Sequence, residues 1–221
     1  MSDVVRVDDA EPPRGTRERL IAVAGEMFAA HGLDGTTGKE ICERAGVNPA
    51  AVNYHFGGLE GLYEAVFIAA RERVVGPRDR ILELLDSALE PEDKLRAIIS
   101  LVVRAALAGD RSSWIPRLVG REVTSPSTIG ARLLASTARP KLERARALVG
   151  ELIGRAPDHP SVSLACISIA APLQLLLIAD HDLLRTIHPA LDLSQGSEPA
   201  MVEHFHRFVM AGLRALKGTE R

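Results

Sequence analysis

The stretch TGKEICERAGVNPAAVNYHF, which begins at Thr37, constrains the fold of this chain most strongly, because it contains the start and stop signals of two short helices. Thr37 and Glu40 have the spacing of a capping box, in which each side chain accepts a hydrogen bond from the backbone N–H of the other. Gly46 suits the left-handed conformation that ends a helix. Asn48 is a favourable cap for a second helix, and Pro49 fits its first position. The sequence therefore predicts a helix-turn-helix.

The second of these helices has an apolar side and a polar side. Val47, Val52 and Phe56 are its large apolar residues, and we expect them to anchor it to the core. The positions expected to face outward are Pro49, Ala50, Ala51, Asn53, Tyr54 and His55. Small residues allow close approach to a partner, an asparagine can pair with a base edge, and tyrosine and histidine can reach phosphates. This layout is typical of a helix that enters the DNA major groove by its N-terminus, the alternative being a helical hairpin that only packs within a bundle.

Residues Thr16 to Tyr63 resemble the N-terminal DNA-binding domain of the TetR/AcrR family of bacterial transcriptional repressors. The matching pieces are a first helix that ends in Phe28 and His31-Gly32, the pair Thr36-Thr37, the run Ile41 to Val47, and Tyr54-His55-Phe56 before the next helix. In that family DNA is met from the start of the second helix and along the third, which implies a double-stranded operator as partner. The matching positions here are Thr37, Gly38, Lys39, Asn48, Pro49, Ala50, Asn53, Tyr54 and His55.

Two positions depart from the family pattern. The family often has a lysine just after the third helix that grips a phosphate, and Leu59 stands there in this chain. The position of Asn53 is commonly aromatic in the family. The operator sequence therefore cannot be borrowed from a relative.

Composition gives no general attraction to nucleic acid. The 221 residues are 46% apolar and 25% charged, with a formal net charge of -2, which is ordinary for a soluble globular protein. Residues 14–64 hold five basic and seven acidic residues. This balance counts against DNA binding, because neutralisation of phosphates by basic residues usually dominates DNA affinity. Arg14, Arg17 and Arg19 lie close together, and helix N-termini and neutral donors also hold phosphates. The two cysteines match no metal or redox spacing, so we expect buried thiols in a reducing, cytoplasmic environment.

The chain is expected to divide near Gly76-Pro77, which breaks the preceding helix. Residues 1–13 are acidic and lack an apolar core, which predicts a disordered lead rather than a signal peptide. Residues 14–76 form the predicted DNA-binding domain. Residues 77–221 would hold the effector-binding and dimerisation domain that the resemblance implies.

Beyond this boundary the strong periodic signals are helical, and no alternating run is long enough for a strand. Apolar spacing around Ile99 and Leu118 indicates helices, as do a long stretch from about Ser127 to Gly154 and two C-terminal stretches. Pro140 predicts a kink or break in the long helix. The segment Arg121 to Pro126 and the surroundings of Pro140 are similar to the C-terminal domain of the CecR-like branch of the family. The predicted fold class is all-α, with about nine or ten helices.

The stretch Val162 to Ala179 is apolar on almost every side, as a membrane span is. Polar interruptions and acidic flanks argue against a bilayer, so protein is expected to cover this helix on several sides. This stretch and the last helix, after Glu198-Pro199, either pair with their copies across a twofold axis or complete the core of one subunit. The resemblance favours a homodimer, with two recognition helices about 34–36 Å apart on a palindromic operator. The expected interface residues are Leu173, Leu176, Leu177, Phe205, Phe208, Val209, Gly212 and Leu213.

Relatives in the family hold a small apolar molecule among the middle helices, and its binding spreads the two DNA-binding heads. The resemblance thus implies a small apolar or amphipathic effector that releases a repressor from its operator. The expected lining is Phe67, Leu101, Arg104, Trp114, Leu118, Arg121 and Leu133. Arg104 lies in an otherwise apolar run: if buried it needs an anionic partner, such as Glu122 or an acidic ligand, and otherwise it is a surface residue with a packed stem.

An enzyme and a protein-binding adaptor are the other function classes. We find no nucleophile elbow, dinucleotide loop, phosphate loop or zinc-binding helix in the sequence, and we expect no cofactor or metal. His181 and His188 could share a helix face, but we expect them to be solvated or capping residues. An adaptor would place Asn53, Tyr54 and His55 against protein or leave them unused, whereas a DNA-binding regulator would place them on a duplex.

Overall fold

The structure is a computed structural model that describes residues 15–75, 80–108 and 114–217. The described residues form eleven α-helices and one 3-10 helix and contain no strand. The predicted all-α class is therefore confirmed, with more helices than expected. The predicted lead at residues 1–13 and the predicted break at Gly76-Pro77 lie outside the described residues.

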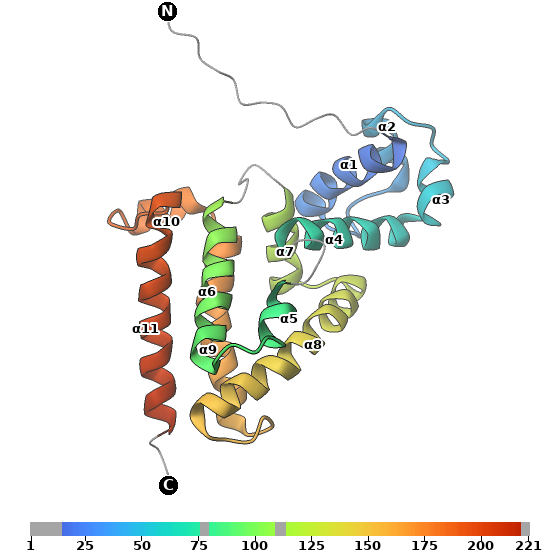
Figure 1. Cartoon of the computed structure of the whole chain (residues 1–221). Helices are drawn as coiled ribbons and strands as arrows, with labels where there is room; N and C mark the ends of the chain where they lie inside the picture. The colour runs from blue at the N-terminus through green and yellow to red at the C-terminus, as the bar shows by residue number, and fades with distance from the viewer. Residues whose placement is uncertain (1–14, 76–79, 109–113, 218–221) are drawn as a thin grey trace, which may run out of the picture.

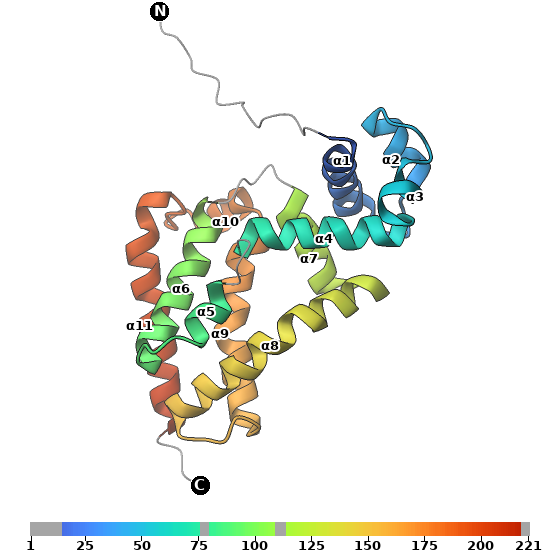
Figure 2. The ribbon, with the colours of Figure 1, turned by 45° about the vertical axis from the view of Figure 1, so that its right-hand side comes forward.

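The first four helices form a head at one end of the molecule (Figure 1). They are α1 (Thr16–His31), α2 (Gly38–Ala45), α3 (Ala51–Phe56) and α4 (Leu59–Val75). α4 runs from the outer edge of the head toward the body, and α11 (Glu198–Lys217) lies on the opposite side of the molecule from α3 (Figures 1 and 2). The surfaces that the sequence predicts for DNA and for a second subunit are thus well separated.

The remaining helices form the body. They are α5 (Arg80–Leu85), α6 (Pro91–Ala108), α7 (Trp114–Thr124), α8 (Thr128–Ile153), α9 (Pro160–Ile178), α10 (His181–Ile187) and the 3-10 helix η1 (Gln195–Ser197), followed by α11. The predicted long helix is α8, which begins after its cap Ser127, ends at the left-handed Gly154 and continues through Pro140. Since α6 packs against both α9 and α11, these three helices surround the main apolar cluster of the body.

Ion pairs between α6 and α11 add to this packing. Arg104 bonds to the Glu198 carboxylate at 2.9 Å, and Arg96 in the first half of α6 pairs with Glu203 in the first half of α11. These groups are partly to largely exposed to solvent, so each pair contributes about 1 kcal/mol or less. The apolar contacts, rather than the charges, hold α11 in place.

The apolar core of the head extends beyond its own four helices. It contains Phe28 and Tyr63, whose rings meet edge to face with centroids 4.8 Å apart. It continues through Trp114, Ile115 and Leu118 of α7, which packs along α1. α7 therefore belongs to the body in sequence and to the head in packing.

Gly25 in α1 allows α7 to approach closely. A Cβ atom placed on Gly25 would lie 2.3 Å from the indole ring of Trp114, well inside contact distance. Trp114 is buried, so its rigid ring cannot move aside without disturbing its neighbours. The absence of a side chain at Gly25 thus fixes the contact between α1 and α7.

We predict that Gly25→Ala destabilises the protein by about 1–3 kcal/mol through overpacking against Trp114, although alanine favours a helix over glycine by about 1 kcal/mol. The free energy of unfolding in urea measures this effect. The matched control is Gly120→Ala in α7, where the added Cβ would lie 3.5 Å from Ile178, an ordinary contact. An equal or stabilising effect of both substitutions would show that the α1–α7 contact is not tight.

Candidate nucleic-acid interface

The predicted capping box at the start of α2 is present. The Glu40 N–H donates to the Thr37 hydroxyl at 3.3 Å, and the Thr37 N–H donates to the Glu40 carboxylate at 3.0 Å. Gly46 ends the helix in the left-handed conformation with φ 63°. The hydrogen bonds from the Thr37 side chain and backbone lower the pKa of the Glu40 carboxyl below its ordinary value. The start of α2 is thus held by local bonds between exposed groups.

The turn before α3 and the first residue of that helix differ from the prediction in two respects. The Asn48 side chain does cap, because it accepts a hydrogen bond from the Ala50 N–H at 2.8 Å. The α-helix itself begins only at Ala51, since the first turn closes with a bond from the Ala51 N–H to the Asn48 carbonyl at 2.9 Å, three residues back. Ala51 is buried rather than exposed as predicted, because it packs within the apolar core of the head. The Cys42 thiol donates to the Pro49 carbonyl at 3.6 Å and ties this turn to α2.

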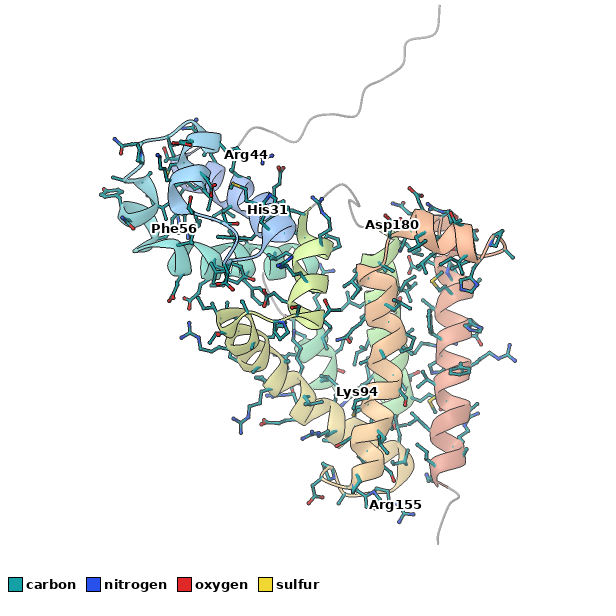
Figure 3. The ribbon with its side chains drawn as sticks, turned by 180° about the vertical axis from the view of Figure 1, so that it is seen from behind. His31, Arg44, Phe56, Lys94, Arg155 and Asp180 are labelled. Atoms are coloured by element: carbon teal, nitrogen blue, oxygen red, sulfur yellow. The ribbon has the colours of Figure 1, made fainter. Side chains whose placement is uncertain are left out.

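The polar residues of α3 point away from the core. Tyr54 is 84% exposed, Asn53 and His55 are exposed beside it, and the rings of Tyr54 and His55 touch edge to face. Phe56 packs on the head core, with the Arg17 guanidinium 5.3 Å from its ring centre. Figure 3 shows Phe56 in the head, far from Arg155 at the other end of the body. One short helix thus presents an aromatic, an amide and an imidazole group to solvent.

The start of α2 lies beside α3. A Cβ atom on Gly38 would lie 3.6 Å from the Val52 side chain, so the two helices are in contact at this point. Eight of the nine predicted DNA-binding residues are exposed, and the ninth, Gly38, is half-buried. The structure therefore places the predicted residues on the exposed edge formed by these two helices.

Two of the basic residues near this edge are paired with acids. Arg44 bonds to Glu26 at 3.4 Å, and Lys39 lies 3.8 Å from Glu43. Both pairs are exposed, so the basic groups can exchange these partners for phosphates at little cost. Leu59 packs against the head core at the start of α4 and offers no charge there.

The predicted effector-lining residues do not form one site. Leu101 and Arg104 line a hollow of about 410 Å³ between α5 and α6. Trp114 and Leu118 instead belong to the head core, with Leu133 packed against it, and Phe67 is buried in α4. Arg121 is exposed and donates to the His31 carbonyl at 3.4 Å. Arg104 is a surface residue paired with Glu198, which is the second of the two alternatives that the sequence left open.

The sequence reasoning missed a buried polar contact at Glu122. This carboxylate is only 2% exposed and accepts a hydrogen bond from the Tyr63 hydroxyl at 2.5 Å. Its position did carry a signal, because Glu122 follows Leu118 by four residues and Trp114 by eight and so lies on the apolar side of α7.

The predicted subunit interface also needs correction. Leu173, Leu176, Val209 and Leu213 are buried in the core of the subunit itself, and Leu177 and Phe205 pack against that core. Of the predicted set, Phe208 and Gly212 remain exposed, Phe208 at 72%. Five further apolar residues, on α9 and α10, are exposed and were not predicted: Leu164, Ile167, Leu175, Leu183 and Ile187.

Helix α9 carries three of these exposed apolar residues, Leu164, Ile167 and Leu175. It is long and apolar enough to cross a membrane, with a mean hydropathy of 2.1, yet only 22% of its most apolar window is buried. Burial on one side only leaves Ile167 64% exposed. The sequence signal was the lack of a polar side on this helix, which cannot show which side stays open.

A helix-turn-helix head on an all-helical body defines a class of two-part DNA-binding regulators. The family model described as bacterial regulatory proteins of the TetR family matches residues 20–66. The model for the C-terminal domain of the helix-turn-helix transcriptional dual regulator CecR matches residues 91–213, more than half of the chain. The chain belongs to the TetR family of transcriptional regulators, with a C-terminal domain of the CecR type.

Curated relatives in this family are regulators. The chain is 31% identical over 91 residues to the transcriptional repressor KstR2 from Mycolicibacterium smegmatis, covering 41% of this chain and 43% of that protein. It is 32% identical over 123 residues to the dual regulator CecR from Shigella flexneri, covering 50% of this chain and 52% of that one. The chain thus spans about half the length of the curated relatives it matches.

Solved structures share the fold over nearly the whole chain. The fatty acid degradation regulator FadR from Bacillus halodurans has a TM-score of 0.60 at 19% identity, covering 90% of this chain and 96% of that one. A TetR/AcrR-family regulator from Thermobifida fusca has a TM-score of 0.53 at 19% identity, covering 93% and 98%. At this level of sequence identity, the similarity shows that the chains share an arrangement of helices, and it does not identify a ligand of this protein.

The capping box generates a prediction about pH. Because the pKa of Glu40 is lowered in the folded protein, its contribution to stability is present above its ordinary pKa of 4.5 and is lost as the pH falls through the lowered value. We expect Glu40→Ala to be less stable than the parent at neutral pH and equally stable in strong acid, as measured by urea unfolding across this range. Glu43→Ala, on the same helix but outside the capping box, is the control. A stability gap for Glu40→Ala that persists in acid would contradict the role of its charge.

Proposed function

We propose that this protein is a transcriptional repressor of the bacterial cytoplasm that binds a double-stranded operator through α3 and the start of α2. The observation that carries the proposal is the exposed group Asn53, Tyr54 and His55 on a helix whose other side is buried in the head core. Asn53 has the groups to read a base edge, and Tyr54 and His55 can bond to phosphates on either side. The exposed Pro49 and Ala50 allow the start of the helix to approach the groove closely.

Residues 14–76 would act as the DNA-binding domain and residues 77–221 as the effector-binding and dimerisation domain. The packing of α7 on α1 places part of the second region against the head. This arrangement supports a regulator in which the state of the body affects the orientation of the head.

A homodimer accounts best for the exposed apolar surface of α9 and α11. The two helices lie side by side on the rear of the molecule (Figure 3). Leu164, Ile167 and Phe208 would lose most of their exposed surface against a second copy, which stabilises association by about 25 cal/mol per Å² of apolar area buried. Twofold pairing of these helices would present two heads to the same face of a palindromic duplex.

The hollow between α5 and α6 supports a small amphipathic effector. Leu84, Ala97 and Leu101 give it an apolar part, and the polar and charged lining residues are Arg80, Glu83, Ser100 and Arg104. A molecule seated there would contact α6, which packs directly against α11 of the proposed interface. An effector could thus change the pairing of the subunits and release the operator.

Substitutions in α3 test the DNA-binding proposal. We expect Tyr54→Ala to weaken binding to duplexes of all sequences, because it removes a phosphate contact. Asn53→Ala is expected to change the preferred sequence, with a loss of about 1–3 kcal/mol at the base pair that it reads. Selection of duplexes from a random pool by each purified variant, followed by fluorescence anisotropy, measures both effects.

The salt dependence of binding provides the internal check on this test. Lys39→Ala should lower the slope of log affinity against log salt by about one. Arg139→Ala, an exposed arginine of α8 paired with Glu143, is the matched control and should leave the slope unchanged. An adaptor that binds only protein would select no duplex, and the three head variants would then behave as the parent does.

The dimer proposal predicts that Ile167→Glu yields a monomer. A carboxylate placed at the centre of an apolar interface would lose its hydration without a partner, which costs several kcal/mol. Sedimentation equilibrium measures the mass. The control is Leu142→Glu, a substitution of an exposed apolar residue on α8 that lies outside the α9–α11 surface. A parent protein that sediments as a monomer, or an Ile167→Glu variant that remains a dimer, would rule out this interface.

A further inference from the structure

Glu122 is the meeting point of three helices. Its first carboxylate oxygen, Oε1, accepts the hydrogen bond from the Tyr63 hydroxyl of α4 at 2.5 Å. The second oxygen, Oε2, accepts from the Ser127 N–H at 2.9 Å and from the Ser127 hydroxyl at 3.2 Å, at the start of α8. Since Glu122 itself is on α7, one buried side chain links the last helix of the head to two helices of the body.

The surroundings of Glu122 leave its carboxylate little room. A Cβ atom on Gly130 of α8 would lie 1.6 Å from Oε2, so the carboxylate occupies the space that any other residue at this position would fill. The Ser127 hydroxyl also accepts from the Gly130 N–H at 3.0 Å, which caps α8. A side chain at Gly130 would therefore displace the Glu122 carboxylate from the start of α8.

The tyrosine keeps its proton in this contact. Burial, followed by the hydrogen bond to Glu122, raises the pKa of the Tyr63 phenol far above its ordinary value. Its ring is also fixed, because it is fully buried and meets Phe28 of α1 edge to face. The donor is thus rigid on the head side, and the acceptor is rigid on the body side.

We propose that the Tyr63–Glu122–Ser127 contact is the joint that sets the orientation of the head on the body, and that Glu122 is therefore a positioning residue for DNA binding by two heads at once. This inference rests on the proposed function as a dimeric operator-binding protein. Apolar packing is not directional and can settle into more than one discrete arrangement, whereas a hydrogen bond is directional and so favours the one arrangement of α4 in which it forms. The joint would select one head orientation, and hence one spacing of the two recognition helices.

Loss of the joint should weaken the binding of two heads to one palindromic duplex more than the binding of one head to a half-site. A single head can reach a half-site from any orientation, because nothing fixes the body. Binding of both heads to a palindrome requires the orientation in which their spacing fits, and the apparent affinity falls in proportion to the fraction of molecules in that orientation. The ratio of palindrome affinity to half-site affinity therefore reports the joint, whereas a general loss of stability would not change this ratio.

The test uses the full-length parent protein and three variants. Tyr63→Phe removes the donor. Glu122→Gln leaves one oxygen to accept and turns an NH₂ group toward a donor. Gly130→Ala keeps every hydrogen-bonding group but displaces the carboxylate. The matched control is Glu151→Gln at an exposed position of α8.

The probes are the palindromic duplex that the parent selects from a random pool and the same duplex with one half-site scrambled. We expect each of the three variants to lose palindrome affinity by about fivefold or more while half-site affinity stays within about twofold. We also expect them to tolerate duplexes with one base pair added between the half-sites better than the parent does. Glu151→Gln should match the parent on every duplex.

The two proposals fail in different ways. If the parent selects no duplex, the proposed function is wrong and the joint has no role in DNA binding. If the parent selects a palindrome but the three variants keep its palindrome to half-site ratio, DNA binding stands and the joint is overturned. Gly130→Ala separates the position of the Glu122 carboxylate from its chemistry, because it keeps every hydrogen-bonding group. An unchanged affinity ratio in this variant would show that the position of Glu122 does not affect DNA binding by two heads.

Discussion

The burial of one side of α3 is the constraint on which the rest of the structure depends. This helix has six residues, far fewer than the roughly 12–15 that an isolated helix needs to be marginally stable in water. Its conformation therefore comes from the contacts of Val52, Ala51 and Phe56 with the head core. Because these residues face inward, Asn53, Tyr54 and His55 must face outward. The exposure of the proposed recognition residues is thus a consequence of packing rather than of helix propensity.

The same core extends into the body, which has consequences for regulation. Trp114 and Leu118 of α7 contribute to the cluster that holds α3 through α1 and α4. Close-packed cores adopt discrete arrangements rather than deforming continuously. Because α7 shares its core with the head, we expect a shift of α7 to rotate the head. The hydrogen bonds of the buried Glu122 carboxylate with Tyr63 and Ser127 are directional and add to this apolar contact. The head and the body are therefore one packed unit at their junction, although they are separate in sequence.

Local signals in the sequence predicted local structure well. Thr37 and Glu40 specify the start of α2, and Gly46 its end, because capping involves groups within four residues of one another. The open side of α9 and the partners of Trp114 and Glu122 could not be predicted, since they depend on which helices meet in three dimensions. A helix that is apolar all round gives no sign of which side will be covered. Thus the exposed edge of α2 and α3, which we propose binds DNA, could be predicted from the sequence, whereas the residues around the proposed effector site and subunit interface could not.

Hydroxyl-radical footprinting of the purified protein on its selected duplex measures directly whether two recognition helices reach one face of DNA. Two protected stretches with centres about 10–10.5 base pairs apart, related by twofold symmetry, are the expected result, because adjacent major grooves on one face are separated by one helical turn. A single protected stretch, or two stretches on opposite faces of the duplex, would contradict the placement of α3 and the pairing of α9 and α11.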